Sequence, residues 1–151
     1  MLTLTTESVM RFVYDDGGRA AAGFKGKAGD CATRAIAIAT SLPYQHVYDH
    51  INQIAVSERR GSRKRGVSNA RTGVYRSAMH KFLGALGWNW TPCMTIGSGC
   101  KVHLRDGELP MGRLVLSLSK HYAAVIDGVL HDTYEDDRGG TRCVYGYWSA
   151  P

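Results

Sequence analysis

The chain of 151 residues has no long apolar run, few cysteines and no repeated or low-complexity tract. No window approaches the roughly 20 apolar residues that a membrane-spanning helix requires, which argues against an integral membrane protein. Residues 1–10 show no basic stretch followed by an apolar core, so no secretory signal is expected. We therefore expect a cytoplasmic protein without a membrane partner, and expect thiols rather than disulfides at the four cysteines, Cys31, Cys93, Cys100 and Cys143.

The length and composition predict a single domain, 1–151, because 44% hydrophobic residues is an ordinary content for a globular protein. Helical periodicity occupies the first half of the chain and predicts helices at 31–40, from 43 or 44 to 55, and at about 73–86. Strand patterns occur at 9–14, 114–118, 121–126, 129–134 and 143–148. Helices followed by a mainly antiparallel sheet predict an α+β fold.

The net charge of +6 is a local feature, because seven of the basic residues fall within 59–76 and the charges elsewhere nearly cancel. We predict an exposed, mobile loop at 57–72, whose basic core is Arg59, Arg60, Arg63, Lys64 and Arg65. One interpretation is a solvated loop, and the other is a patch that contacts an acidic protein, an acidic substrate or nucleic-acid phosphates. No aromatic residue interleaves these charges, so base stacking is not supported.

A cysteine stands at the predicted start of the first helix, in the sequence GDCATRA. Asp30 is a favourable N-cap residue, expected to accept bonds from the amides of the first turn. Cys31 then takes the first helical position, where the helix dipole favours thiolate over thiol. Taken alone, a buried and inert cysteine is the alternative interpretation.

A histidine and a carboxylate come together in the predicted hairpin around Asp127-Gly128, a strong two-residue turn signal. With Ile126 opposite Val129, side-chain alternation places His121 and Asp132 on one face as diagonal neighbours. A base held by a third group is the arrangement that activates a thiol. The alternatives are a structural histidine and an aspartate that caps the following turn.

The segments GDCATRAIAIATSLPYQHVYD and HYAAVIDGVLHDTYEDDRGGTRCVYGYW resemble the papain-like cysteine peptidase superfamily. More narrowly, they are similar to small uncharacterised bacterial and phage proteins described as papain-like or bacteriocin-peptidase-like. The resemblance implies a Cys-bearing helix packed on an antiparallel sheet, no cofactor, and a peptide or protein substrate. It also implies Cys31 as the nucleophile, His121 as general base and then acid, and Asp132 as the group that orients the histidine.

The chain departs from that superfamily just before the cysteine, where a glutamine usually donates to the oxyanion. The six residues at 25–30 include neither Gln nor Asn. Lys25 or Lys27, together with the Cys31 amide, or backbone amides of the glycine-rich stretch, are the candidate replacements. Loss of one such donor typically costs about 10²- to 10³-fold in rate.

A metal site is not expected, because the spacing of Cys93, Cys100, His103 and Cys143 matches no common zinc motif. The leading hypothesis is a thiol hydrolase that cleaves a peptide, isopeptide or related amide through an acyl-enzyme. Transfer of the acyl group to an amine is a second outcome of the same chemistry. The rival is a non-catalytic binding module, a phage or bacterial inhibitor or adaptor that uses the basic loop.

Overall fold

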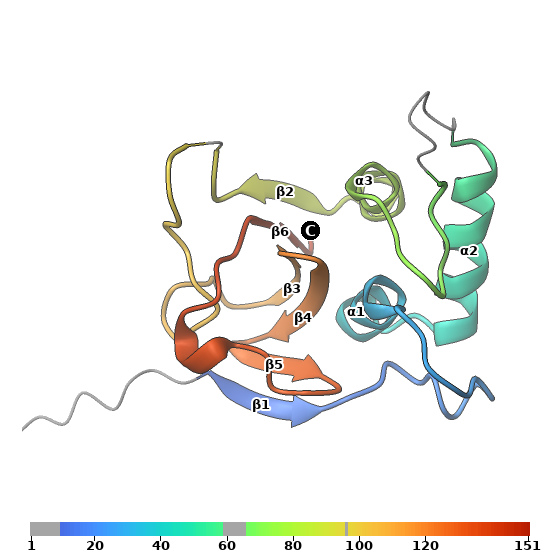
Figure 1. Ribbon diagram of the computed structural model, residues 1–151, viewed down its shortest axis with the longest axis horizontal. Coiled ribbons are helices and arrows are strands. Elements are labelled where there is room, and N and C mark those ends of the chain that lie inside the picture. Colours follow the sequence, from blue (N-terminus) through green and yellow to red (C-terminus); the bar gives the residue numbers. More distant parts are fainter. Residues whose placement is uncertain (1–9, 59–65, 96) are drawn as a thin grey trace, which may run out of the picture.

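The computed structural model describes residues 10–58, 66–95 and 97–151, which form an α+β structure (Figure 1). Its α-helices are α1 (Cys31–Thr40), α2 (Tyr44–Val56) and α3 (Arg76–Ala85). Its strands are β1 (Arg11–Tyr14), β2 (Asn89–Pro92), β3 (Arg113–Leu118), β4 (His121–Ile126), β5 (Val129–Asp132) and β6 (Gly146–Ser149). The predicted α+β class is confirmed.

The strands form one sheet in the order β1-β5-β4-β3-β6-β2. Every pairing is antiparallel except that of β1 with β5, so the sheet is mixed at one edge. Strand β2 was not predicted, because its four residues include Asn89 and Pro92 and show no apolar alternation. Strand β6 begins three residues later than predicted, because Cys143 pairs instead with His103 in an isolated bridge.

The helices lie on one side of the curved sheet, with α2 outermost (Figure 1). Helix α1 contacts β4 and β3, while α2 contacts α1 and α3. One apolar cluster fills the space between helices and sheet and includes Ile36, Phe82 and Trp148. A second cluster lies on the other face of the sheet, where loops cover Leu116 and Leu130. Helix α1 is therefore enclosed between the sheet and α2, which explains why its Ala and Ile residues are buried almost all round.

The predicted helix boundaries hold for α1 and α2 but not for α3. Helix α3 begins at Arg76 rather than near Gly73, because Gly73 has φ +153° and closes a turn with Asn69. No helix of the described ranges is long and apolar enough to cross a bilayer.

The β4–β5 hairpin has the predicted register. Ile126 pairs with Val129, and Ala124 pairs with His131. Asp127 and Gly128 both have positive φ, at 49° and 77°, as a two-residue hairpin turn of this kind requires. The register fixes which side chains of β4 and β5 share a face, and it therefore positions His121 beside Asp132.

Two expectations from the sequence are wrong. Cys100 and Cys143 form a disulfide, with their Cα atoms 5.8 Å apart. This Cα separation is within the usual range for a disulfide. The isolated bridge between His103 and Cys143 brings the two segments together. The loop predicted at 57–72 is not wholly exposed either, because Ser68 and Ala70 are buried. The Thr33 hydroxyl of α1 donates a hydrogen bond to the Ala70 carbonyl.

Candidate functional site

The structure brings Cys31, His121 and Asp132 together where α1 and β4 begin. Cys31 and His121 line the same pocket, and the interaction of the His121 ring with the thiol lowers the pKa of the thiol. The other side of the ring faces the carboxylate, with Nε2 of His121 2.7 Å from Oδ2 of Asp132. Asp132 is held in turn by the Thr133 N–H, which donates to Oδ1 at 2.7 Å. The three predicted side chains thus lie in one series, in which a hydrogen bond joins His121 to Asp132 and the histidine acts on the thiol.

The charges of this series favour a thiolate beside an imidazolium. Burial raises the pKa of the Cys31 thiol, but His121, the Tyr122 backbone N–H and Arg34 together bring that pKa below its usual value. Burial likewise lowers the pKa of His121, but the hydrogen bonds and charges of Asp132 and Cys31 raise it to about 9. The histidine is therefore protonated at neutral pH and the titration of the thiol is shifted toward the thiolate, as in an activated cysteine.

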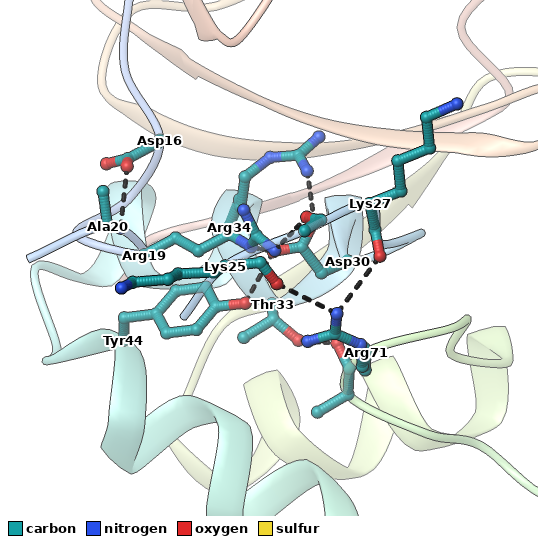
Figure 2. A network of polar contacts seen from close by, with 12 residues as sticks. Asp16, Arg19, Ala20, Lys25, Lys27, Asp30, Thr33, Arg34, Tyr44 and Arg71 are labelled. Atoms are coloured by element: carbon teal, nitrogen blue, oxygen red, sulfur yellow. Dashed lines mark hydrogen bonds and ion pairs between the residues drawn. The ribbon is translucent and has the colours of Figure 1, made fainter. Parts of the chain in front are cut away.

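Asp30 does not cap α1 as predicted, because its side chain makes no bond to the first-turn amides. The carboxylate is 1% exposed and pairs with Arg34, with Tyr44 and with Arg19 (Figure 2). The Tyr44 hydroxyl donates at 2.5 Å, and the Arg19 Nε lies 3.3 Å from Oδ2. Two guanidinium groups and a phenol attract a buried carboxylate more strongly than neutral amides do. The first-turn N–H groups of α1 consequently have no side-chain cap.

Arg34 connects this cluster to the series that ends at Asp132. One of its nitrogens pairs with Asp30, and Nη2 lies 3.6 Å from Oδ1 of Asp132. Arg34 therefore bridges the carboxylate that precedes Cys31 and the carboxylate that orients His121. Arg34 was not among the predicted site residues, although its spacing of four from Asp30 at a predicted helix start is the signal of an i,i+4 ion pair.

A pocket of about 700 Å³ opens at Cys31 and His121. Its walls come from the segment before α1, the start of α3, the turn between β3 and β4, and the chain after β5. The residues that line it include Asp30, Arg34, Arg76, Ser117, Lys120 and Tyr122. A substrate of peptide size has room to reach the sulfur in this pocket.

The remaining predicted site residues are not placed at the thiol. Lys25 and Lys27 do not line the pocket, and their backbone carbonyls accept bonds from the Arg71 guanidinium (Figure 2). The basic residues Arg59, Arg60, Arg63, Lys64 and Arg65 lie outside the described residues.

Three of the four residues considered as metal ligands have other partners in the structure. Cys100 and Cys143 are bonded to each other, and His103 pairs with Glu108 through Nδ1 at 3.1 Å. Within the described ranges, no group of three or more His, Cys, Asp or Glu side chains could hold a metal ion.

The chain matches no protein-family model, and no curated protein or solved structure is similar to it at a significant level.

Proposed function

We propose that the protein is a papain-like thiol hydrolase that attacks a peptide, isopeptide or related amide through Cys31. The observation that carries the proposal is that Cys31 and His121 line one pocket, while the His121 ring is hydrogen-bonded to Asp132 and lowers the pKa of the thiol. The order of the three residues along the chain, and the helix start at Cys31, match the resemblance noted from the sequence. Fold and chemistry are thus proposed together as papain-like.

In the proposed reaction the Cys31 thiolate adds to the amide carbonyl carbon. The His121 imidazolium then gives its proton to the leaving nitrogen as the C–N bond breaks, which leaves a thioester on the sulfur. Neutral His121 next takes a proton from water while the water oxygen attacks the thioester. This step releases the carboxylic acid product and restores the thiolate. Asp132 holds the ring through Nε2 and stabilises its charge throughout.

The negative charge that develops on the carbonyl oxygen needs hydrogen-bond donors. In place of the lysines suggested by the sequence, we assign this role to the first-turn N–H groups of α1, above all that of Cys31. They lack partners within the helix, and Asp30 does not cap them. Such backbone donors stabilise an oxyanion without having to reorganise during the reaction.

The proposal is tested by comparing Cys31 with Cys93, the other free and half-buried cysteine of the described residues. Burial raises the pKa of Cys93, whereas that of Cys31 is lowered. At pH 6.5, iodoacetamide should therefore alkylate Cys31 more than about tenfold faster than Cys93, since only thiolates react. Mass spectrometry of the two cysteine-containing peptides over time measures both rates. Equal rates would contradict the proposal and favour the non-catalytic binding module.

The role assigned to Asp132 predicts a change in the titration of His121. Asp132→Asn removes a charge that raises the pKa of His121, so the apparent pKa should fall from about 9 toward neutrality. Because the folded value exceeds the ordinary 6.5, the charged ring stabilises the fold fully below pH 6.5, and this contribution is lost as pH rises through about 9. A pH titration of the His121 ring signals by NMR measures the shift. An unchanged pKa would show that Asp132 does not hold the imidazolium.

A further inference from the structure

The pocket at Cys31 carries more positive charge than its own carboxylate can balance. Among the described residues that line it, only Asp30 is acidic, whereas Arg34, Arg76 and Lys120 are basic. Asp30 is already paired with both Arg19 and Arg34. Arg76 and Lys120 remain, and neither forms an ion pair with a carboxylate of the described residues.

Arg76 is held at the pocket by two neutral groups. Its Nη2 donates to the Ser117 hydroxyl at 3.2 Å, and its guanidinium lies 5.3 Å from the centre of the Trp90 ring. These contacts fix the direction of the side chain without neutralising it. Arg76 is also the first residue of α3, whose first turn contains no acidic residue. A cation at this end opposes the helix dipole, so the position is unfavourable for the helix itself.

Lys120 occupies a second locally unfavourable position. It lies in the tight turn between β3 and β4, directly before His121, and its φ of 54° is one that glycine or asparagine adopts more readily. The buried Arg142 anchors this turn, because its Nη2 donates to the Ser119 carbonyl at 2.7 Å. The backbone that carries Lys120 is therefore fixed beside the reactive histidine.

Two cations in locally disfavoured positions, both at one pocket and both without a counter-ion, indicate a role other than stability. We propose that Arg76 and Lys120 bind a carboxylate side chain of the substrate, so that the enzyme cleaves amides next to acidic residues. This inference rests on the proposed function and names its substrate class, an acidic peptide or protein segment. The other cations of the site, Arg34 and His121, are engaged by Asp30 and Asp132 and contribute less to this selection.

The test uses two matched peptide acyloxymethyl ketones, Ala-Glu-Gly and Ala-Gln-Gly, in which the Cys31 thiolate displaces the carboxylate leaving group at the methylene carbon next to the ketone. The wild-type protein should react with the Glu probe at least about fivefold faster than with the Gln probe. High salt should reduce this ratio, because it screens the charges. Arg76→Gln and Lys120→Asn should each lower this ratio about twofold to fivefold, as expected for partly exposed charge pairs. Each substitution suits its backbone position better than the native residue, so both variants should fold.

Arg11→Gln and Lys101→Gln serve as matched controls, because both residues are exposed and lie outside the pocket. Their ratio should equal that of the wild type. If Cys31 reacts with both probes at equal rates, or if the ratio does not depend on Arg76 and Lys120, the inference is wrong while the thiol hydrolase stands. If neither probe labels Cys31 in preference to Cys93, the proposed function itself fails.

Discussion

With p-nitrophenyl acetate as a small ester substrate at pH 7, His121→Ala should slow the acylation of Cys31 by about 10²- to 10⁴-fold. Burial raises the pKa of Cys31, but His121, the Tyr122 N–H and Arg34 together outweigh it and lower that pKa. Without the ring, burial is opposed only by the Tyr122 N–H and Arg34, so the thiol pKa rises and the thiolate fraction at neutral pH falls. The first burst of nitrophenolate, measured by stopped-flow absorbance, gives the acylation rate directly.

His131→Ala is the matched control for this experiment. His131 lies on the same hairpin, but its Nδ1 is 3.4 Å from Asp15, and it does not line the pocket. Its removal should leave the burst within about twofold of the wild type, in line with a substitution outside the reacting groups. The His121→Ala variant should regain much of its rate above pH 9, where the thiolate forms without help. Equal slowing in both variants, or no recovery at high pH, would contradict the role of His121.

The hairpin was predictable from the sequence because its determinants are local. Asp127-Gly128 fixes the turn, the turn fixes the register, and strand alternation then places His121 and Asp132 on one face. The bounds of α1 were also predicted correctly: the run of Ala and Ile indicates the helix, and Ser41 and Pro43 end it. The start at Cys31 was predicted from an N-cap role of Asp30, which the structure does not show. These elements carry all three residues of the proposed site.

The parts that were not predictable depend on contacts between distant segments. The side chain of Asp30 was expected to cap α1, but the fold brings Arg19 and Tyr44 beside it, and charge-assisted bonds replace the cap. Similarly, Cys100 and Cys143 are separated by 43 residues and meet only because the chain around residue 103 pairs beside β6. The spacing of residues along the sequence does not tell which distant segments come into contact. The disulfide and the clustering of cations at the pocket are therefore seen only in the structure.

The cluster around Asp30 is expected to be a main source of stability for the site, and Asp30→Asn should lower the free energy of unfolding by about 3 kcal/mol. The amide keeps the shape and can still accept the Tyr44 hydrogen, but it leaves Arg19 and Arg34 without their buried counter-ion. The lower end of the usual range applies because Arg19 is partly exposed and Arg34 retains Asp132. For a domain of this length the melting temperature should fall by about 6–12 °C.

Urea unfolding followed by tryptophan fluorescence measures this loss, with Asp49→Asn as the control. Asp49 is exposed on α2 and accepts one bond from the Gln45 amide, so its replacement should change stability by less than about 0.5 kcal/mol. A comparable small change in Asp30→Asn would mean that the cluster does not hold the start of α1. If the loss is large, Asp30 stabilises the helix start through side chains instead of through a cap, and the first-turn N–H groups stay open beside the nucleophile. A carboxylate bonded to those amides would stabilise the helix equally well, but it would occupy the place that the proposed reaction requires for the substrate oxyanion.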